Sequence, residues 1–222
     1  MTAWSEFLNH QGRPVHKWLH YFTAYERHFA RFVNQPLLFI EIGCGRGGSL
    51  QMWKKYFGPD AQIVGIDIHK ECKEFEEEHV AVRIGSQADT EFLGKVLAEF
   101  GTPDIVLDDG SHHMNHVVTT FNYLFQRTSP KGVYMVEDLH TAYWEDFEGG
   151  LGRPGTFVEI CKSLTDELNA GWGKGAPQPT DFSRSALSIH FYNSIIAIER
   201  GRLLKTAAPM IPPPADWPAK AV

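Results

Sequence analysis

The sequence predicts an α/β fold in which a doubly wound, mostly parallel sheet is covered by helices on both faces. Three observations carry this prediction. Five short apolar segments alternate with segments of helical character, a glycine-rich loop follows the first of them, and acidic residues follow three of the others. The 222 residues are 43% hydrophobic and 22% charged, an ordinary globular composition that suffices for a three-layer core without disulfides.

The apolar segments have the length of buried strands, and each is bounded by turn-forming or polar residues. The predicted strands occupy residues 37–42, 62–68, 80–84, 104–107 and 132–136. The predicted helices between them occupy residues 48–57, 70–78, 89–100 and 114–127. Because strands and helices alternate with short connections, we expect right-handed βαβ units and a parallel sheet.

The two ends of the chain differ from this alternating core. Aromatic residues recur at steps of three and four within residues 15–33, which predicts an amphipathic helix packed on the core. Near the other end, the pattern predicts a helix at 157–168 and an antiparallel hairpin. Its strands are expected at 187–198 and 203–205, on either side of a turn at the charged run 199–202. We divide the chain into an N-terminal helical segment (1–35), a main domain (36–206) and a proline-rich tail (207–222).

Composition and charge exclude several classes of function. The formal net charge of −6 gives no overall basic field to attract nucleic acid or an anionic membrane. No apolar run approaches the ~18 residues of a membrane span, and the N-terminus lacks the apolar core of a signal peptide. Cys44, Cys72 and Cys161 are widely separated, unlike the cysteines of a disulfide framework or zinc site. We therefore expect a cytoplasmic protein with reduced thiols.

The glycine-rich loop has the features of a cofactor site. Gly43, Gly45 and Gly47 let the backbone approach a ligand closely, and the following helix offers free N–H groups at its start. Asp67, at the end of the second strand, is placed to accept both hydroxyls of a ribose. These features fit NAD or S-adenosylmethionine. Glu41 favours S-adenosylmethionine, because its charge would repel a pyrophosphate and suits a cationic methionine group.

The loop after the third strand offers polar groups to the same ligand. Ser86 and Gln87 are suited to hydrogen-bond the edge of an adenine. The same loop also fits a simple helix cap at Asp89, so the residues alone leave both interpretations open.

Four carboxylates follow the fourth and fifth strands. Asp108 and Asp109 end one strand, and Glu137 and Asp138 end the next. Because parallel strands present their carboxyl ends at one edge of the sheet, we expect these side chains to crowd together. Mutual repulsion would raise their pKa values unless a cation joined them, and an all-oxygen set favours Mg²⁺ or Mn²⁺.

A histidine lies on the same loop as the first pair of acids. His112 follows Asp109 by three residues, and an imidazole can accept a proton from a hydroxyl near neutral pH. A hydroxyl bound to a metal is more acidic, which makes that transfer easier. An alternative use of His112, as a zinc ligand together with His116, lacks a third soft ligand.

Taken in order, these motifs resemble a known family. The segments HKWLHYFTAYERHF, EIGCGRGGSLQMWKKYFG, GIDI, GSQADTEFL, DDGSHH and VEDLHTAYW resemble class I methyltransferases of the macrolide-sugar type, exemplified by the mycinamicin and macrocin O-methyltransferases. Enzymes described as cephalosporin hydroxylases are relatives. The likeness covers roughly residues 15–145. It implies a Rossmann-like sheet of seven strands with an antiparallel last strand.

The resemblance also implies roles for individual residues. It implies that S-adenosylmethionine lies at the loop from Gly43 to Gly47, with Asp67 on the ribose and Gln87 near the adenine. It implies that His112 is the general base. It also implies that Mg²⁺ is bound by Asp109, Glu137 and Asp138.

Two further positions follow from the same likeness. Tyr21, with its aromatic helix, is expected to close over the cofactor, and Asp108 is expected to face the cofactor or support the metal ligands.

We therefore predict a metal-dependent O-methyltransferase that acts on a hydroxyl of a sugar or natural-product-like small molecule. One alternative keeps the fold and cofactor but uses a phenolic or catechol acceptor. A second is a noncatalytic protein that retains the cofactor loop as an assembly module. The aromatic N-terminal region and the tail are plausible contact surfaces, so we also expect a homo-oligomer.

Overall fold

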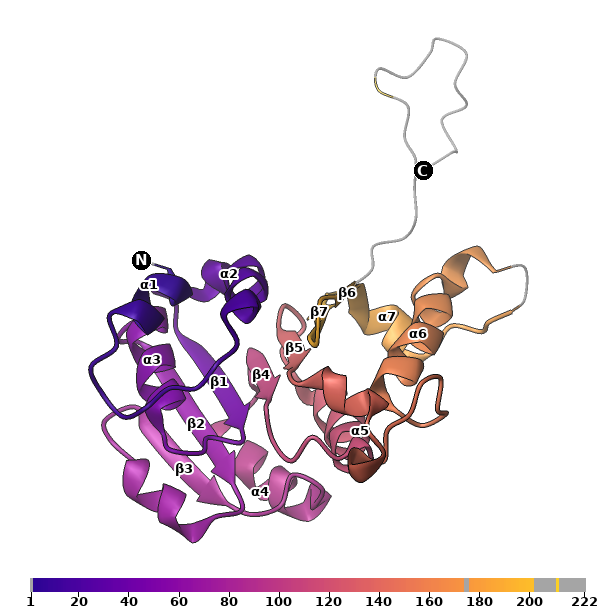
Figure 1. The fold of residues 1–222 in the computed structure, drawn as a ribbon. Coiled ribbons are helices and arrows are strands. Elements are labelled where there is room, and N and C mark those ends of the chain that lie inside the picture. Colours follow the sequence, from indigo (N-terminus) through magenta and orange to yellow (C-terminus); the bar gives the residue numbers. More distant parts are fainter. Residues whose placement is uncertain (1, 174–175, 202–210, 212–222) are drawn as a thin grey trace.

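A computed structural model describes residues 2–173, 176–201 and 211 (Figure 1). Within these residues, a seven-stranded sheet has the order β3-β2-β1-β4-β5-β7-β6. The strands are β1 (Leu37–Ile42), β2 (Ala61–Asp67), β3 (Val80–Ile84), β4 (Ile105–Asp108), β5 (Val133–Val136), β6 (Ala186–Phe191) and β7 (Ile196–Arg200). The first five run parallel, and β7 is antiparallel to both β5 and β6. The predicted doubly wound α/β fold is confirmed.

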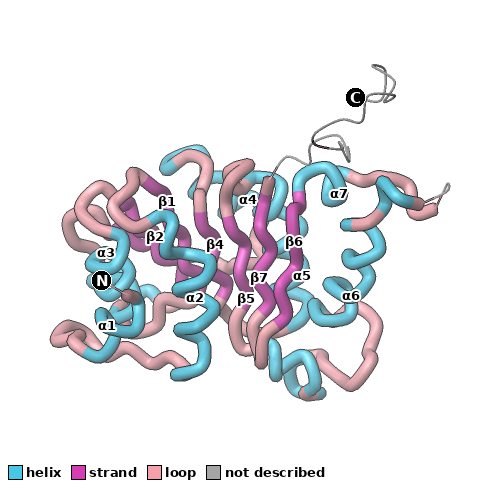
Figure 2. Tube along the Cα trace, turned by 90° about the horizontal axis from the view of Figure 1, so that it is seen from above, coloured by secondary structure: helices cyan, strands magenta, loops and turns pink. Residues whose placement is uncertain are grey.

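Helices cover both faces of this sheet (Figure 2). They are α1 (Ala3–Leu8), α2 (Phe22–Phe29), α3 (Gly48–Phe57), α4 (Thr90–Phe100), α5 (Met114–Leu124), α6 (Phe157–Leu168) and α7 (Asp181–Ser185). Alternate residues of β1 point to opposite faces: Phe39 joins the core under α1, α2 and α3, while Ile40 joins the core under α4, α5 and α6. None of the described helices is both long and apolar enough to cross a membrane.

The strand order brings the functional loops together. β1 lies between β2 and β4, so the chain winds away from it in both directions, and such a switch point is where open α/β sheets bind ligands. Backbone hydrogen bonds continue past the strand ends: the amide of Asp109 donates to Ile42 at 2.9 Å, and the amide of Glu137 donates to Asp108 at 2.9 Å. The ends of β1, β4 and β5 are therefore fixed relative to one another.

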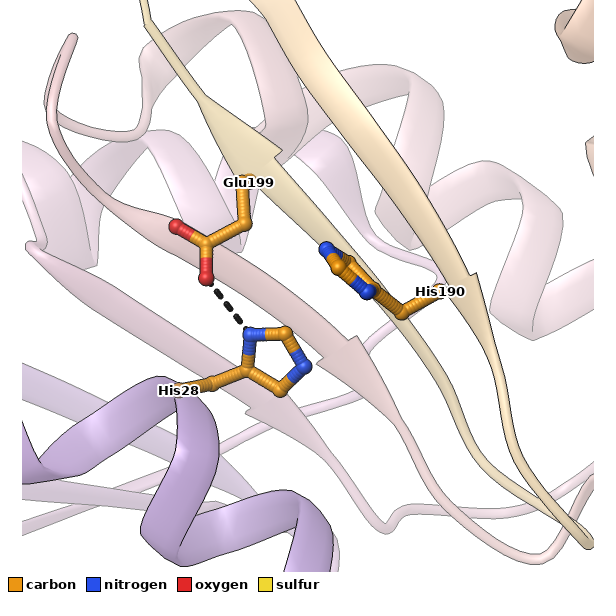
Figure 3. Close-up of side chains that lie close together, drawn as sticks. All are labelled: His28, His190 and Glu199. Carbon is orange, nitrogen blue, oxygen red and sulfur yellow. Dashed lines mark hydrogen bonds and ion pairs between the residues drawn. The ribbon is translucent and has the colours of Figure 1, made fainter.

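A cluster of two histidines and a glutamate joins α2 to the C-terminal hairpin. We call His28, His190 and Glu199 the histidine cluster (Figure 3). Nδ1 of His28 lies 2.5 Å from Oε1 of Glu199, and Nε2 of His28 lies 2.9 Å from the Tyr192 hydroxyl. Arg31 donates to the second Glu199 oxygen at 2.5 Å. These bonds hold the aromatic N-terminal segment against the sheet.

The predicted hairpin turn was wrong. We expected the turn at the charged run 199–202, but the strands meet at residues 192–195, where Ser194 has a φ of 64°. Glu199 and Arg200 instead belong to β7. Both side chains find partners inside the fold, since Glu199 bonds His28 and Arg31 while Arg200 donates to the carbonyl of Phe125 at 2.8 Å. The predicted strand 203–205 lies outside the described residues.

Two predicted helices are shorter than the sequence suggested. Within 15–33, helical structure begins only at the 3-10 turn Leu19–Tyr21, and the preceding residues 15–18 have no regular secondary structure. Residues 70–78 form only the 3-10 segment Lys70–Phe75. Apart from Ile211, the predicted tail lies outside the described residues, and the division into three regions stays a prediction.

A candidate active site at the carboxyl ends of the strands

The glycine loop between β1 and α3 packs directly against the loop after β4. Gly43 has a φ of 84°, and a Cβ there would lie 2.0 Å from the carbonyl oxygen of Asp109. Only glycine permits both this backbone conformation and this approach. Gly47 has a φ of 71° and forms the N-cap of α3. The loop therefore brings the start of α3 beside the acidic residues.

Asp67 braces the same loop from the end of β2. Its Oδ2 accepts a hydrogen bond from the amide of Gly45 at 3.0 Å, and its Oδ1 accepts one from the amide of His69 at 3.0 Å. Each oxygen retains further acceptor capacity, and the residue lines an open cavity. This position fits the predicted ribose contact.

Gln87 and Asp108 form a buried pair beneath that cavity. The Gln87 amide nitrogen donates to both oxygens of Asp108 at 3.0 and 3.2 Å, and its oxygen accepts from the Ser111 amide at 2.7 Å. Burial raises the pKa of Asp108 to about 7, although the bonds from Gln87 oppose that rise. Ser86 and Gln87 line the cavity, whereas Asp108 lies behind it, where it fixes Gln87.

Two adjoining cavities meet at the glycine loop. One of about 380 Å³ is lined by Asp67, Ser86 and Gln87, and the other, of about 430 Å³, is lined by Lys17 and Ser49. The two share Gly43, Gly45 and Asp109 among their walls. Together they form a bent cleft along the predicted cofactor residues.

A buried lysine lies among three of the site's carboxylates. We call Glu41, Asp109, Glu137 and Asp138 the acidic cluster. Nζ of Lys17 lies 2.7 Å from Oδ2 of Asp109, 3.2 Å from Glu41, and 3.2 and 3.3 Å from the two oxygens of Glu137. The Lys17 side chain is only 3% exposed. Sequence analysis missed this residue.

One ammonium does not neutralise three carboxylates, and the pKa values reflect this. Burial raises the pKa of Glu137 to about 8, with Lys17 opposing the shift and Asp109 adding to it. Burial also raises the pKa of Glu41. Burial by itself lowers the pKa of Lys17, but its three acidic neighbours reverse the effect and hold that pKa well above its usual range. The cluster therefore holds more buried carboxyl groups than one ammonium can keep ionised.

Two tyrosines from the aromatic segment complete the cluster. The Tyr25 hydroxyl donates to Glu137 at 2.6 Å, and the Tyr21 hydroxyl donates to Asp138 at 2.6 Å. Both phenols are buried, and burial followed by these acidic partners raises their pKa values. Tyr21 thus contacts the acidic cluster, whereas the resemblance placed it over the cofactor.

His112 lies on the other side of Asp109 from Lys17. Its Nε2 is 3.9 Å from Oδ1 of Asp109 and 3.8 Å from Oδ2 of Asp138. His112 and Asp138 both have left-handed backbones, with φ of 60° and 54°. Such conformations are strained in residues other than glycine and concentrate at functional sites. His116 instead bonds Ser111, with Nδ1 2.8 Å from the hydroxyl oxygen.

The donor set fits a hard divalent cation. Three of the carboxylates already converge on one cation, the Lys17 ammonium. In the described part of the chain, Asp109, His112 and Asp138 also form a group whose ligand atoms lie within 4.8 Å of one another. Asp109 is common to both arrangements, and oxygen-rich ligand sets of this kind favour Mg²⁺ or Mn²⁺.

Lys17 and Tyr25 are the site residues that the sequence did not reveal. Lys17 lies 92 and 120 residues from Asp109 and Glu137, and Tyr25 lies 112 residues from Glu137. Their segment carries an aromatic pattern and part of the family likeness, but neither assigns these two side chains to the acids. One signal was present in the sequence. Four acids at adjoining strand ends require a cation, and that cation can be a lysine ammonium or a metal ion.

The fold and the cleft define a class. A seven-stranded sheet with an antiparallel β7, and a glycine loop opposite an acid at the end of β2, form the class I methyltransferase fold. The solved structure of the methyltransferase MycE from the mycinamycin pathway, in complex with Mg, SAH and mycinamycin VI, has the same fold. Its TM-score is 0.81 at 34% identity, over 91% of this chain and 54% of that one.

Sequence comparisons agree with this structural likeness. The chain is 38% identical to the mycinamicin VI 2''-O-methyltransferase of Micromonospora griseorubida, over 89% of this chain and 52% of that enzyme. It is 37% identical to a rhamnosyl-tetracenomycin 3'-O-methyltransferase of Streptomyces olivaceus, over 87% and 53%. The chain is thus a homologue of macrolide and sugar O-methyltransferases in the region that it shares with them, as its motifs predicted.

The match covers most of this chain but only part of each relative. The chain spans about half the length of the curated relatives it matches. No family profile matches the chain.

Proposed function

We propose that this chain is an S-adenosylmethionine- and Mg²⁺-dependent O-methyltransferase that acts on a sugar hydroxyl of a glycosylated natural product. One observation carries the proposal: Asp109 is at once a wall of the two-part cleft and a member of the acidic cluster. A cation held there would lie beside a ligand in the cleft.

The cleft suits S-adenosylmethionine in both chemistry and shape. Asp67 supports the ribose, and Ser86 and Gln87 border the adenine end. Lys17, Ser49 and the start of α3 border the second cavity, where the methionine end fits. When bound, this cofactor supplies an electrophilic methyl group. The glycine loop and Asp67 position it against the acidic cluster.

The metal role falls to Asp109, Glu137 and Asp138. A divalent ion there supplies Lewis acidity, which lowers the pKa of a hydroxyl that it holds. Mg²⁺ and SAH are both present in the MycE complexes that this chain resembles, and Mn²⁺ would suit the same oxygen donors.

His112 is the proposed general base. Asp109 and Asp138 flank its ring and stabilise the imidazolium that forms when it takes the acceptor's proton. The catalytic contribution of this chain is then mainly orientation and charge stabilisation. His112 also lies close enough to these acids to serve as a metal ligand, and the His112 variant in the Discussion separates the two roles.

A sugar-bearing acceptor fits the surroundings of His112. The ring of His140 lies beside Asp138, which also flanks His112. Its centroid is 6.3 and 4.7 Å from those of Trp18 and Trp144. Both indoles are about half exposed. Aromatic faces of this kind suit the apolar faces of sugars. The relatives are named for methyl transfer to mycinamicin VI and to rhamnosyl tetracenomycin, which supports a glycoside over a free catechol.

The test is methyl transfer from labelled S-adenosylmethionine to three acceptors: a rhamnosylated polyketide, a macrolide glycoside and a catechol. We expect a sugar methyl ether, formed only with Mg²⁺ or Mn²⁺ and abolished by EDTA. Methylation of catechol alone would replace the proposed substrate class. Binding of S-adenosylhomocysteine that is unaffected by metal, with no transfer to any acceptor, would favour the noncatalytic alternative.

The proposal extends to a homo-oligomer in the cytoplasm. Trp4 and Leu8 expose apolar surface on α1, and Cys44, Cys72 and Cys161 are free thiols. Light scattering coupled to gel filtration tests the assembly, and a monomer at micromolar concentration would contradict it.

A further inference from the structure

The position of Lys17 has consequences for how the acidic cluster accepts a metal. The ammonium bonds both oxygens of Glu137 and one oxygen of Asp109, at 2.7 to 3.3 Å. Two of the three proposed metal ligands are therefore already committed to a cation that belongs to the chain. An ammonium and a divalent ion repel strongly at this spacing, so the two cannot share these oxygens.

The segment that carries Lys17 is otherwise largely exposed. Within residues 11–20, all of which the structure describes, only Lys17 is buried. Upstream, Arg13 is anchored by a 2.9 Å bond from its amide to Gln51 and a 3.1 Å bond from its guanidinium to Phe75. Between this anchor and the 3-10 turn Leu19–Tyr21, the backbone has no regular secondary structure. Lys17 thus attaches its segment to the site through its charge.

We propose that Lys17 is a resident counter-cation that holds the acidic cluster together in the metal-free protein and is displaced when a divalent ion binds. This inference rests on the metal site of the proposed function. Glu41 remains available to the displaced ammonium, because it is not one of the proposed metal ligands. Ser49 bonds its Oε2 at 2.6 Å, and Lys17 bonds its other oxygen.

Displacement also links the metal to the cofactor cleft. Pro14, Val15, His16 and Lys17 form one wall of the cavity proposed for the methionine end. When the ion releases Lys17 from Glu137, this wall shifts. Metal binding therefore reshapes the cavity before catalysis begins.

The test replaces the charge and keeps the length of the side chain, in Lys17→Met. With EDTA present, we expect a lower melting temperature than in the wild type, because the acids lose the ammonium that three of them share. We expect Mn²⁺ to bind at least about tenfold more tightly, measured by electron paramagnetic resonance of free Mn²⁺. Lys55→Met is the control for Mn²⁺ affinity, which it should leave unchanged, because the exposed Lys55 side chain pairs with Glu6 at 3.0 Å and not with the acidic cluster.

Further measurements keep the proposal falsifiable if Lys17→Met does not fold. Lys17→Arg keeps the charge and should bind Mn²⁺ no more tightly than the wild type. In the wild-type chain, Trp18 is 53% exposed beside Lys17, so Mg²⁺ should change the tryptophan emission, and Trp18→Phe should remove that change. An emission that does not respond to saturating Mg²⁺ contradicts displacement.

Asp138→Asn tests the metal site independently of the counter-cation role of Lys17, because Asp138 makes no contact with Lys17. If this variant abolishes Mn²⁺ binding while Lys17→Met leaves the affinity unchanged or weaker, the metal site stands and the counter-cation proposal is wrong. If Asp138→Asn leaves Mn²⁺ binding unchanged, the metal site itself is wrong, and the inference fails with it.

Discussion

The acidic cluster and the histidine cluster use carboxylates in opposite ways. Glu199 has a partner for each of its oxygens, since the Arg31 guanidinium bonds one and the His28 ring bonds the other. Glu137 shares a single ammonium with Glu41 and Asp109. The histidine cluster therefore has enough positive charge to balance Glu199, whereas the acidic cluster has too little to balance its carboxylates. The first stabilises the fold, and the second has the acidic groups to hold a divalent ion in place of Lys17.

The pKa values of the two glutamates show the same contrast. Burial opposes ionisation of Glu199, but bonds from His28 and Arg31 outweigh it and lower the pKa to about 2. At Glu137, burial and Asp109 outweigh Lys17 and raise the pKa to about 8. A buried acid that lacks sufficient counter-charge marks a functional site more often than a structural one.

The largest expected effect separates the histidines of the two regions. His112→Ala should lower kcat by about 10²- to 10⁴-fold, because the acceptor loses its base. Affinity for S-adenosylhomocysteine and for Mn²⁺ should change little, as calorimetry can show. His190→Ala is the control, and its kcat should stay within a few-fold of the wild type. If His112→Ala instead loses Mn²⁺ binding, His112 is a metal ligand.

A matched pair of amide substitutions tests the charge contrast directly. Glu199→Gln should lower the free energy of unfolding by about 1–3 kcal/mol, because His28 and Arg31 lose a charged partner inside the fold. Glu137→Gln should change it by less than about 1 kcal/mol in EDTA, because it removes repulsion along with one ion pair. Urea denaturation measures both. A larger loss from Glu137→Gln than from Glu199→Gln would mean that the acidic cluster is a structural element.

The fold was predictable because its signals are local. Apolar runs of strand length, the glycine loop and an acid at the end of β2 each depend on a few neighbouring residues. The hairpin was misplaced because Glu199 and Arg200 resemble a polar turn until His28 and Phe125, far away in the sequence, are brought to them. Contacts with residues distant in the sequence therefore set the position of the hairpin turn.

The site was predictable only as far as parallel strands dictate it. Asp109 and Glu137 had to meet, because β4 and β5 end side by side. Lys17 and Tyr25 reach these acids from an irregular segment and a helix whose packing no local pattern encodes. The roles of the predicted metal ligands, of the cofactor residues and of His112 stay predictions until the variants are measured.

The pH dependence of the free energy of unfolding tests the role of Glu199 in the histidine cluster. The pKa of Glu199 is lowered when the chain folds, so its contribution to stability is complete above its ordinary value near 4.5. It is lost as pH falls toward about 2. The free energy of unfolding should therefore fall more steeply below pH 4.5 in the wild type than in Glu199→Gln. Parallel acid limbs in urea titrations would show that the carboxylate of Glu199 carries no such linkage.

The smallest expected effect concerns the outer partner of Glu199. The Arg31 side chain is 43% exposed, and water screens its ion pair, whereas His28 is buried on the other side of the same carboxylate. Arg31→Met should cost no more than about 1 kcal/mol of unfolding free energy, and the cost should shrink in 1 M salt. His28→Ala should cost more at both salt concentrations, because it also breaks the bond to Tyr192 and leaves a cavity. If Arg31→Met were the more damaging change, Glu199 would depend mainly on its exposed partner, and the buried bond in Figure 3 would not be what holds α2 to the hairpin.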